Sequence, residues 1–329
     1  MKLRYKIIIS VVLLGILIIT GSAFLGAEYL AELCLSPVKP EDARDSEYYL
    51  PQKSDVQNKE EDPFELAAQS SMDESYIWLK ENAAVKSIQS FDNLTLRAYV
   101  VKNESHNWLI AMHGFRSEPR SMSPYARHFF EEGFNVVVPG QRGHGWSDGT
   151  FIDMGYYCAD DVKSWVDEII RNDSESRIVL YGLSMGASAV LMAQNKNLPE
   201  NVVCIIEDSA YTSAWDELAF KMQKNYGLPA NPLLSITSLI AKKRYGFRYE
   251  DVSPLEAVKK ARKPVLFIHG VDDDVVPLSM LSELYDASSC VKEKFEVPGA
   301  QNSRSLFADT FAYWEKVDSF VFRFFKEIN

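Results

Sequence analysis

Short apolar runs alternate with amphipathic segments over most of the chain, from about residue 72 to the C-terminus. Runs typical of buried strands end at Met112, Pro139, Tyr181, Ile206 and Ile268. Apolar residues at helical spacing fill several of the intervals between them. This alternation predicts a mostly parallel sheet with helices on both faces. Because ligands of such sheets bind beyond the carboxyl ends of the strands, the residues after each run are the candidates for a site.

The pattern also predicts where individual elements lie. Strands are expected over residues 87–90, 94–101, 108–112, 135–139, 178–181, 202–206, 265–268 and 294–297. Helices are expected over residues 75–82, 125–132, 160–171, 187–193 and 320–328.

The N-terminal segment contains a continuous uncharged stretch. The 21 residues 7–27 carry no charge, and Lys2, Arg4 and Lys6 precede them. A helix of this length is roughly 31 Å long, close to the thickness of a bilayer core. The basic residues favour a cytoplasmic N-terminus. We therefore expect a cytoplasmic tail over residues 1–6, a transmembrane anchor over 7–27, and a single-pass protein of the cell membrane whose C-terminal domain is extracytoplasmic.

A cleaved signal peptide is the alternative for the same segment. Gly21, Ser22 and Ala23 are small residues of the kind found before a cleavage site, and the protein would then be secreted. The apolar run continues beyond that site through Phe24 and Leu25, which favours the anchor.

An acidic stretch follows the uncharged segment. Residues 41–65 hold nine acidic and three basic residues, a net charge of −6 in a chain whose net charge is −11. This composition is typical of a solvated linker, which we expect over residues 28–70, before a folded domain over 71–329. The net acidity, with no cluster of Lys or Arg to offset it, excludes a nucleic-acid-binding surface from the expected functions.

The strongest motif is the sequence GLSMG from Gly182 to Gly186. It follows an apolar strand and precedes a helix, which is the context that a Gly-x-Ser-x-Gly turn requires. Such a turn lifts the serine hydroxyl clear of the backbone, and the helix N-terminus behind it favours developing negative charge. Ser184 is thus the candidate nucleophile. The alternative is a glycine-rich turn with an incidental serine.

Two other strand ends carry groups that suit the same chemistry. His113 and Phe115 follow the run that ends at Met112, and backbone N–H groups of Phe115 and Met185 would point at an oxyanion. One such donor is worth about 3 kcal/mol of transition-state stabilisation. Residues 272–274 are three successive aspartates after another strand, where a carboxylate can orient a histidine. Charge alone does not choose among the three, and a solvated turn or a cation site is the alternative.

These motifs resemble the serine aminopeptidase and monoacylglycerol-lipase branch of the α/β-hydrolase superfamily, and the anchored arrangement is similar to that of bacterial membrane-bound members. The resemblance covers about residues 72–329 and implies an α/β-hydrolase fold with a short helical cap. The family's spacing in the HGxxDxxVP run implies Asp273 as the acid. Gly140 departs from the family, which usually has Asp there. Beyond the serine and acid runs, the matching residues are His113, Gly114, Tyr125, Phe129, Gly133, Phe134, Arg142, Gly143, His144, Gly145, Ser147 and Gly149.

A larger departure concerns the catalytic base. In the family a histidine follows the last strand, and the matching position here is Asn302; no histidine follows His269. A neutral amide has no usable basicity near pH 7, so Asn302 cannot take the proton of Ser184. We interpret the histidines of this chain as structural rather than as a relocated base: His106, His113, His128, His144 and His269.

Three explanations of Asn302 stay open. It is a substitution introduced to trap substrate, the mark of a natural pseudo-hydrolase, or a sign that an unexpected residue acts as the base. The sequence favours a serine hydrolase lineage with impaired or absent turnover. The alternative is a non-catalytic surface protein that binds a small apolar or peptide ligand. A structural membrane scaffold has no support beyond the anchor.

The segment between the strands that end at Ile206 and begin at Val265 is longer than a crossover needs. Two helices are expected there, over residues 212–226 and 233–245, and the family carries a lid at this position, here about 211–252. Their apolar residues suit acyl chains or hydrophobic side chains, although packing on the domain explains them nearly as well. The expected substrate is a small molecule or peptide with an ester, amide or thioester carbonyl. No cofactor or metal is implied, since the four cysteines lack C-x-x-C spacing. No pattern specifies an oligomeric state.

Overall fold

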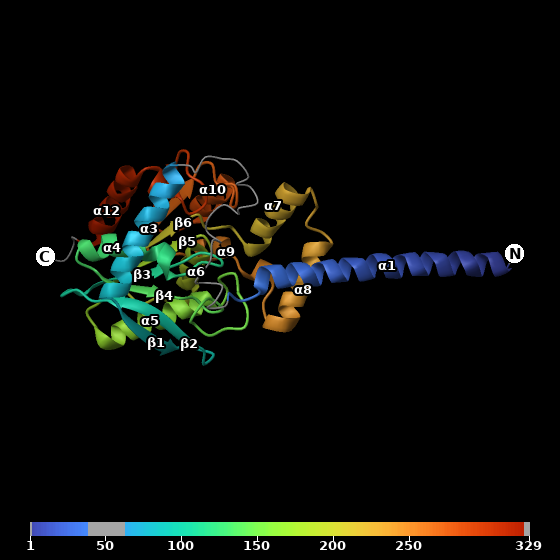
Figure 1. Cartoon of the computed structure of the whole chain (residues 1–329), viewed down its shortest axis with the longest axis horizontal. Coiled ribbons are helices and arrows are strands. Elements are labelled where there is room, and N and C mark those ends of the chain that lie inside the picture. Colours follow the sequence, from blue (N-terminus) through green and yellow to red (C-terminus); the bar gives the residue numbers. More distant parts are fainter. Residues whose placement is uncertain (1, 39–62, 326–329) are drawn as a thin grey trace.

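The protein is described here by a computed structural model that covers residues 2–38 and 63–325. Its described part forms an eight-stranded sheet in the order β1-β2-β4-β3-β5-β6-β7-β8 (Figure 1). The pairs β1–β2 and β2–β4 are antiparallel, and all other neighbouring strands pair in parallel. The strands are β1 (Ala84–Gln89), β2 (Thr95–Val101), β3 (Asn107–Met112), β4 (Asn135–Pro139), β5 (Arg177–Leu183), β6 (Val202–Asp208), β7 (Val265–Gly270) and β8 (Lys292–Val297).

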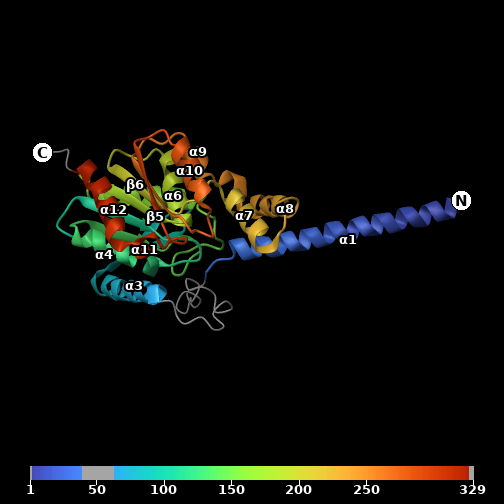
Figure 2. The same ribbon diagram turned by 90° about the horizontal axis from the view of Figure 1, so that it is seen from above.

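Helices cover both faces of this sheet (Figure 2). One face is buried beneath α4 and α12, with α3 beside them, and the other beneath α5, α6 and α10. Two separate apolar cores result, because alternate residues of each buried strand point to opposite faces. The helices are α1 (Lys2–Leu35), α3 (Pro63–Asn82), α4 (Ser123–Glu131), α5 (Cys158–Asn172), α6 (Met185–Ala193), α7 (Ala214–Tyr226), α8 (Leu233–Tyr245), α9 (Pro254–Val258), α10 (Leu278–Ala287), α11 (Ser305–Ala308) and α12 (Thr310–Phe325).

Two helices, α7 and α8, lie over the carboxyl ends of the strands and form the cap. Both end at a glycine in the left-handed conformation, Gly227 after α7 and Gly246 after α8, where a residue without Cβ fits best. The cap shares a third apolar core with the loops beneath it. The prediction of two helices in this insertion agrees with the structure.

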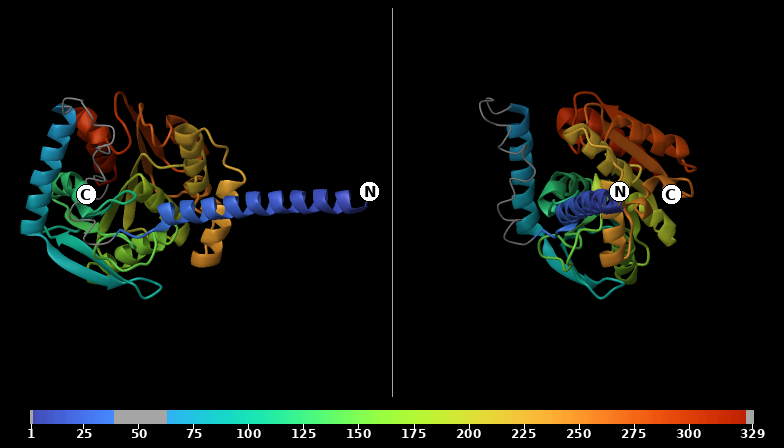
Figure 3. Two further views of the ribbon diagram at one scale, coloured as in Figure 1. Left: turned by 45° about the vertical axis from the view of Figure 1, so that its right-hand side comes forward. Right: turned by 90° about the vertical axis from the view of Figure 1, so that its right-hand side faces the viewer.

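Helix α1 projects from the same side of the domain as the cap (Figures 1 and 3). It is the one helix of the described chain that is long and apolar enough to cross a membrane, with a mean hydropathy of 1.7 over Leu13–Leu35. The helix continues beyond the predicted anchor as far as Leu35. Of the predicted linker, residues 28–35 belong to α1 and 63–70 to α3, while 39–62 lie outside the described residues.

The sequence analysis misses several helical segments of the described chain. Helices α9, α10 and α11 were not predicted; α9 and α11 are short, and α10 follows a turn rich in aspartate. Helix α3 begins at Pro63, twelve residues before the predicted helix over 75–82, and α12 begins at Thr310, ten residues before the predicted helix over 320–328. Residues 326–328 of the predicted helix lie outside the described chain.

Candidate active site

Ser184 occupies a sharp turn between β5 and α6. Its backbone has φ 50° and ψ −114°, a conformation that costs a non-glycine residue of the order of 1–3 kcal/mol. The two flanking glycines make the turn possible. A Cβ on Gly182 would lie 2.3 Å from the Gly186 carbonyl oxygen, and one on Gly186 would lie 2.2 Å from the Met112 carbonyl oxygen. Ser184 is half-buried among buried neighbours, so the turn presents this residue at the strand ends.

The neighbouring strands fix the position of this turn. In the register of β3 and β5, Met112 lies opposite Gly182, so the loop that begins at His113 starts beside the serine turn. On the other side, the backbone N–H of Ser184 donates to the carbonyl of Asp208 at 2.8 Å. Phe115 and Met185 belong to one apolar cluster above these strand ends. Met185 is the first residue of α6, where backbone N–H groups have no acceptor within the helix.

His113 and His144 are held by backbone groups on both ring nitrogens. Nε2 of His113 accepts from the N–H of Gln141 at 3.0 Å, and its Nδ1 lies 2.9 Å from the Gly114 carbonyl oxygen. Nε2 of His144 accepts from the N–H of Arg116 at 3.0 Å. Burial lowers the pKa of His113 to about 3 and that of His144 to about 4. These neutral rings brace the two loops and leave no ring nitrogen for Ser184.

The loop that carries the Arg-Gly-His-Gly run is fixed by a buried ion pair. The Arg142 side chain is 2 % exposed and its guanidinium binds both carboxylate oxygens of Asp161, at 2.6 and 2.7 Å. A further bond at 2.9 Å reaches Asp92. At Gly140, a Cβ would lie 2.5 Å from Nε1 of Trp146. The indole therefore fills the space that a side chain at Gly140 would need.

Asp273 differs from its two acidic neighbours in being buried. Asp272 and Asp274 are exposed, whereas the Asp273 side chain is fully enclosed. One of its oxygens accepts the backbone N–H groups of Val275 and Val276, at 2.9 and 2.8 Å. Such a carboxylate has a fixed orientation because both bonds come from its own loop. The structure thus separates Asp273 from the run of three by burial and by these two hydrogen bonds.

Asn302 binds the acid. Its Nδ2 donates to Oδ2 of Asp273 at 2.8 Å, and its Oδ1 accepts from the Ser303 hydroxyl at 3.2 Å. The residue lies in the turn after β8, between Gly299 and Ser303, both of which have positive φ. The amide thus makes to the acid the hydrogen bond that the Nδ1–H of a triad histidine makes. Unlike a histidine, Asn302 has no second ring nitrogen that could face away from Asp273 and act as a base.

His269 is a second neighbour of the acid. Its Nε2 lies 3.2 Å from Oδ2 of Asp273 and 2.9 Å from the Val276 carbonyl oxygen, and the side chain is fully buried. Burial acts to lower the pKa of His269, but the Asp273 carboxylate reverses this and raises it overall. The Nε2 of His269 therefore supports the loop of Asp273, while its Nδ1 is buried without a hydrogen-bond partner among the described residues.

The end of β6 carries two buried carboxyl groups that the sequence analysis missed. Burial raises the pKa of Glu207 to about 8 and that of Asp208 to about 6. Asp208 accepts from the hydroxyls of Ser305 at 2.9 Å and Tyr313 at 3.0 Å. The backbone of Ser303 donates to the Ser209 hydroxyl at 3.4 Å. The adjacent acids after an apolar strand were the available signal. Asp208 and Ser209 bond to the serine turn and to the segment around Asn302, whereas Glu207 accepts the backbone N–H of Ala210.

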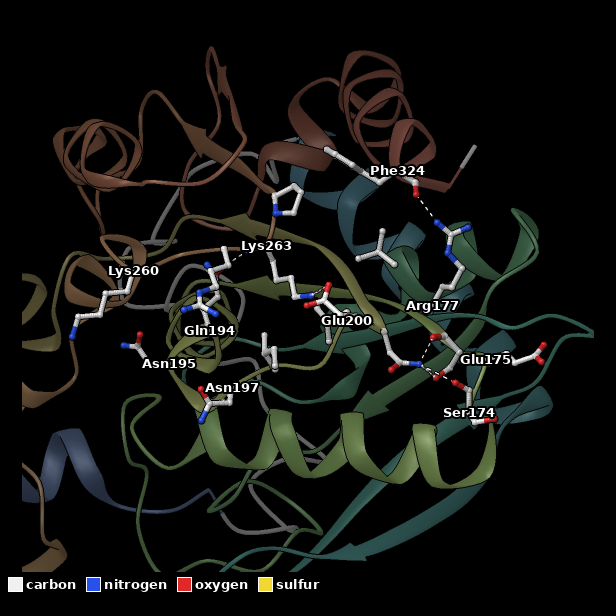
Figure 4. Close-up of a pocket in the computed structure, with 17 residues that line it drawn as sticks. Ser174, Glu175, Arg177, Gln194, Asn195, Asn197, Glu200, Lys260, Lys263 and Phe324 are labelled. Carbon is white, nitrogen blue, oxygen red and sulfur yellow. Dashed lines mark hydrogen bonds and ion pairs between the residues drawn. The ribbon is translucent and has the colours of Figure 1, made fainter. Parts of the chain in front are cut away.

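A separate hollow of about 1070 Å³ lies at the opposite, N-terminal edge of the sheet (Figure 4). Two of its basic groups are held by neighbours. Lys263 pairs with Glu200 at 3.2 Å, and the Arg177 guanidinium donates to the backbone carbonyls of Phe324 and Phe325. This hollow lies away from Ser184, which is at the carboxyl ends of the strands. Among the residues that the structure describes, no group of three or more His, Cys, Asp or Glu side chains is placed to hold a metal ion.

Comparison with known proteins agrees with this geometry. The family described as serine aminopeptidase, S33 matches residues 103–245, which include the serine turn and most of the cap but neither Asp273 nor Asn302. The uncharacterized protein YqkD of Bacillus subtilis is 30% identical over 251 residues, 75% of this chain and 81% of its own length. The protein bem46 of Schizosaccharomyces pombe is 26% identical, over 63% of this chain and 66% of its own.

Solved structures show the same fold. The esterase Pf2001 of Pyrococcus furiosus superposes with a TM-score of 0.62 at 23% identity, covering 75% of this chain and 95% of its own. Est1E of Butyrivibrio proteoclasticus, solved with bound ferulic acid, gives 0.57 at 19% identity over 74% of this chain and all of its own. The sheet, the Ser184 turn and these relatives together place the chain in the serine aminopeptidase S33 family of the α/β-hydrolase superfamily.

Proposed function

We propose that the chain is a membrane-anchored serine hydrolase whose site is complete except for its base. Ser184 is the nucleophile, Asp273 is the orienting acid, and the backbone N–H groups of Phe115 and Met185 form the oxyanion hole. Asn302 stands at the third triad position in place of histidine. The substrate carries an ester or amide carbonyl.

The observation that carries this proposal is the hydrogen bond of 2.8 Å from Asn302 to Asp273. A chain that had abandoned hydrolase geometry would have no reason to keep a buried acid that binds the residue at the base position. With an amide there, the Ser184 hydroxyl keeps its proton near pH 7. Loss of the base alone costs about 10⁶-fold in kcat, and the oxyanion hole and binding retain roughly 10³–10⁴ over water.

A non-catalytic binding protein is the second candidate. It is favoured by the satisfied state of Asn302, whose donor and acceptor are both bonded, so the residue is built into the turn. Such a protein would bind a small apolar or peptide ligand above Ser184 and would not release a product.

The membrane anchor is part of the same proposal. Helix α1 is exposed at Leu13, Leu17 and Leu25, which are 60%, 69% and 70% accessible. A row of apolar side chains this exposed needs an apolar surface to contact, and the lipid chains of a bilayer supply one. We place the tail over residues 1–6 in the cytoplasm and the domain over 71–329 outside the cell membrane. Secretion after cleavage near Ala23 is the alternative, and the length of the N-terminus in mature protein distinguishes the two.

The test measures hydrolysis of p-nitrophenyl esters and labelling by a fluorophosphonate in the full-length chain. The variants are Asn302→His, Ser184→Ala and the double substitution. The proposal expects turnover in Asn302→His, and none in either variant that lacks Ser184. Turnover through Ser184 in the unsubstituted chain would show that another residue is the base. Absence of reaction in every variant that folds would favour the binding protein.

A further inference from the structure

The last turns of α1 are built into the cap. Ala27 and Ala31 are fully buried, and they contact Ile240 and its neighbours on α8. The Thr237 hydroxyl lies 3.4 Å from the Ala27 carbonyl oxygen, and Arg244 on the last turn of α8 pairs with Glu28. Small residues on α1 let the two helix axes approach closely, so the anchor and the cap form one packed unit.

The end of α1 is also bonded to the loops around Ser184. The Arg116 guanidinium donates to the Leu33 carbonyl at 2.9 Å, directly after the proposed oxyanion-hole residue Phe115. The N–H of Ile152 donates to the Leu35 carbonyl at 2.8 Å. Leu35 lies in the same apolar cluster as Met185, the residue after the serine. The helix therefore forms part of the wall above the site.

The exposed and the packed parts of α1 meet without a spacer. Residues 7–25 precede the packed part and span about 28 Å at 1.5 Å per residue, close to the ~30 Å of a bilayer core. Among those whose side chains are described, the large apolar residues from Ile9 to Leu25 are at least half exposed. Burial against the cap begins at Ala27. A bilayer around the exposed part would therefore end where α8 begins to cover the helix.

The surface of the cap has the composition of a membrane interface. Three apolar side chains are exposed there: Tyr226 at the end of α7 (68%), Leu228 in the loop that follows (46%) and Leu239 on α8 (51%). The last turn of α8 adds the three consecutive basic residues 242–244, of which Arg244 is paired with Glu28 and Lys242 lies 3.9 Å from Asp251. Exposed apolar side chains next to basic ones bind anionic lipid surfaces through burial and charge together. All views show α7 and α8 on the side from which α1 leaves (Figures 1 and 3).

We infer that the cap rests on the lipid bilayer and that the site receives its ligand there. The ligand is an amphiphile whose long apolar group comes from the membrane and whose ester or amide group reaches Ser184. This inference rests on the proposed function for the anchor and for the reactive carbonyl. The rigid junction of α1 and α8 holds the cap at one distance from the membrane, because a continuous helix with a packed partner cannot bend freely.

Depth-dependent fluorescence quenching tests the position of the cap. The full chain, with Cys290→Ser to remove its one partly exposed thiol, is inserted into vesicles of phosphatidylcholine and phosphatidylglycerol. A dye is attached at Leu228→Cys or Leu239→Cys and quenched by spin-labelled lipids. Val291→Cys is the matched control, since it is 59% exposed and directly precedes β8, at the strand end opposite the cap. Leu17→Cys reports insertion of α1.

We expect quenching at residues 228 and 239 to approach that at 17 and to exceed that at 291 severalfold. Quenching at 17 with none at 228 or 239 would overturn the inference and leave the anchor intact. No quenching at 17 would instead refute the anchor of the proposed function and the inference with it. Cap quenching that is lost in vesicles of phosphatidylcholine alone would assign the contact to the basic residues.

The ligand class is tested in the same vesicles with the Asn302→His variant. We compare a p-nitrophenyl ester of a long acyl chain, which partitions into the bilayer, with the water-soluble acetate. The inference expects the ratio of long-chain to acetate turnover to be at least tenfold higher in vesicles than in detergent. An equal ratio in both would overturn the ligand assignment. Absence of turnover for both esters would refute the hydrolase proposal, while the quenching result would still decide the position of the cap.

Discussion

The turn that holds Ser184 and the turn that holds Asn302 lie on opposite sides of the end of β6, and they are constrained differently. The first is fixed by backbone, since added Cβ atoms at Gly182 and Gly186 would overlap carbonyl oxygens. The second is fixed by side-chain hydrogen bonds to Asp273 and Ser303. The difference teaches that the backbone geometry around Ser184 and the hydrogen bonding at Asn302 reside in separate residues. In the proposed site, the first is kept while the base is absent.

The largest expected effect tests the missing basicity directly. Asn302→His should raise kcat for an activated ester by up to about 10⁶-fold, because the imidazole accepts the Ser184 proton while donating to Asp273. The new activity should rise with pH through the pKa of the introduced imidazole, since only the neutral ring is a base. The measurement is the pH dependence of kcat. Asn302→Gln, which keeps an amide, is the control, and an equal gain in it would contradict the explanation.

A glycine substitution tests the rigidity of the serine turn. Gly186→Ala places a Cβ 2.2 Å from the Met112 carbonyl oxygen, and relief requires the β3 end to move. We expect a loss of about 3–5 kcal/mol in the free energy of unfolding and loss of labelling at Ser184. Gly133→Ala is the matched control, since nothing lies within 4 Å of its added Cβ and only its positive φ opposes the change. Denaturant unfolding measures both, and equal losses would show that the close contact is unimportant.

The buried carboxyl group of Glu207 at the end of β6 can be tested through pH. Burial raises the pKa of Glu207 from 4.5 to about 8, so the folded chain binds more protons than the unfolded chain between these values. The free energy of unfolding should therefore fall as pH rises from about 5 to 8. Glu207→Gln should remove about 2–4 kcal/mol of that fall. Thermal unfolding across this range is the measurement. Glu283→Gln, at an exposed position of α10, is the control, and an unchanged slope in Glu207→Gln would show that Glu207 is not the source of the fall.

The smallest expected effect concerns the hydrogen bond of Asn302. Asn302→Leu leaves the buried Asp273 carboxylate without one donor, which should cost about 1–3 kcal/mol of stability. Ser303→Ala removes only a longer bond of 3.2 Å at a half-exposed amide and should cost less, about 0.5–1 kcal/mol. Chemical denaturation of the two variants measures the difference. A larger loss in Ser303→Ala would mean that the turn, rather than the acid, depends on this hydrogen-bond network.

Prediction of the fold from the sequence succeeded where burial creates a pattern. The strands β3, β4 and β5 are buried on both faces, and the apolar runs that end at Met112, Pro139 and Tyr181 marked them. The helix α12 was only partly found: its predicted start was Phe320, although the residues that it buries from Tyr313 onward already follow helical spacing. Of the site, the serine turn was found through its glycines, whereas the buried acids Glu207 and Asp208 looked like the end of an apolar strand.

What the sequence by itself determined is the identity and order of the chemical groups. The turn around Ser184 needs glycine at fixed neighbours, the absence of a histidine after His269 is plain, and the uncharged residues 7–27 specify a helix suited to lipid. These conclusions are local, because they depend on residues close together along the chain. Tertiary structure alone decided which of three aspartates is buried and that Asn302 bonds to it across 29 positions. It also placed the end of α1 against the cap, since packing between distant segments leaves no periodic trace in either one.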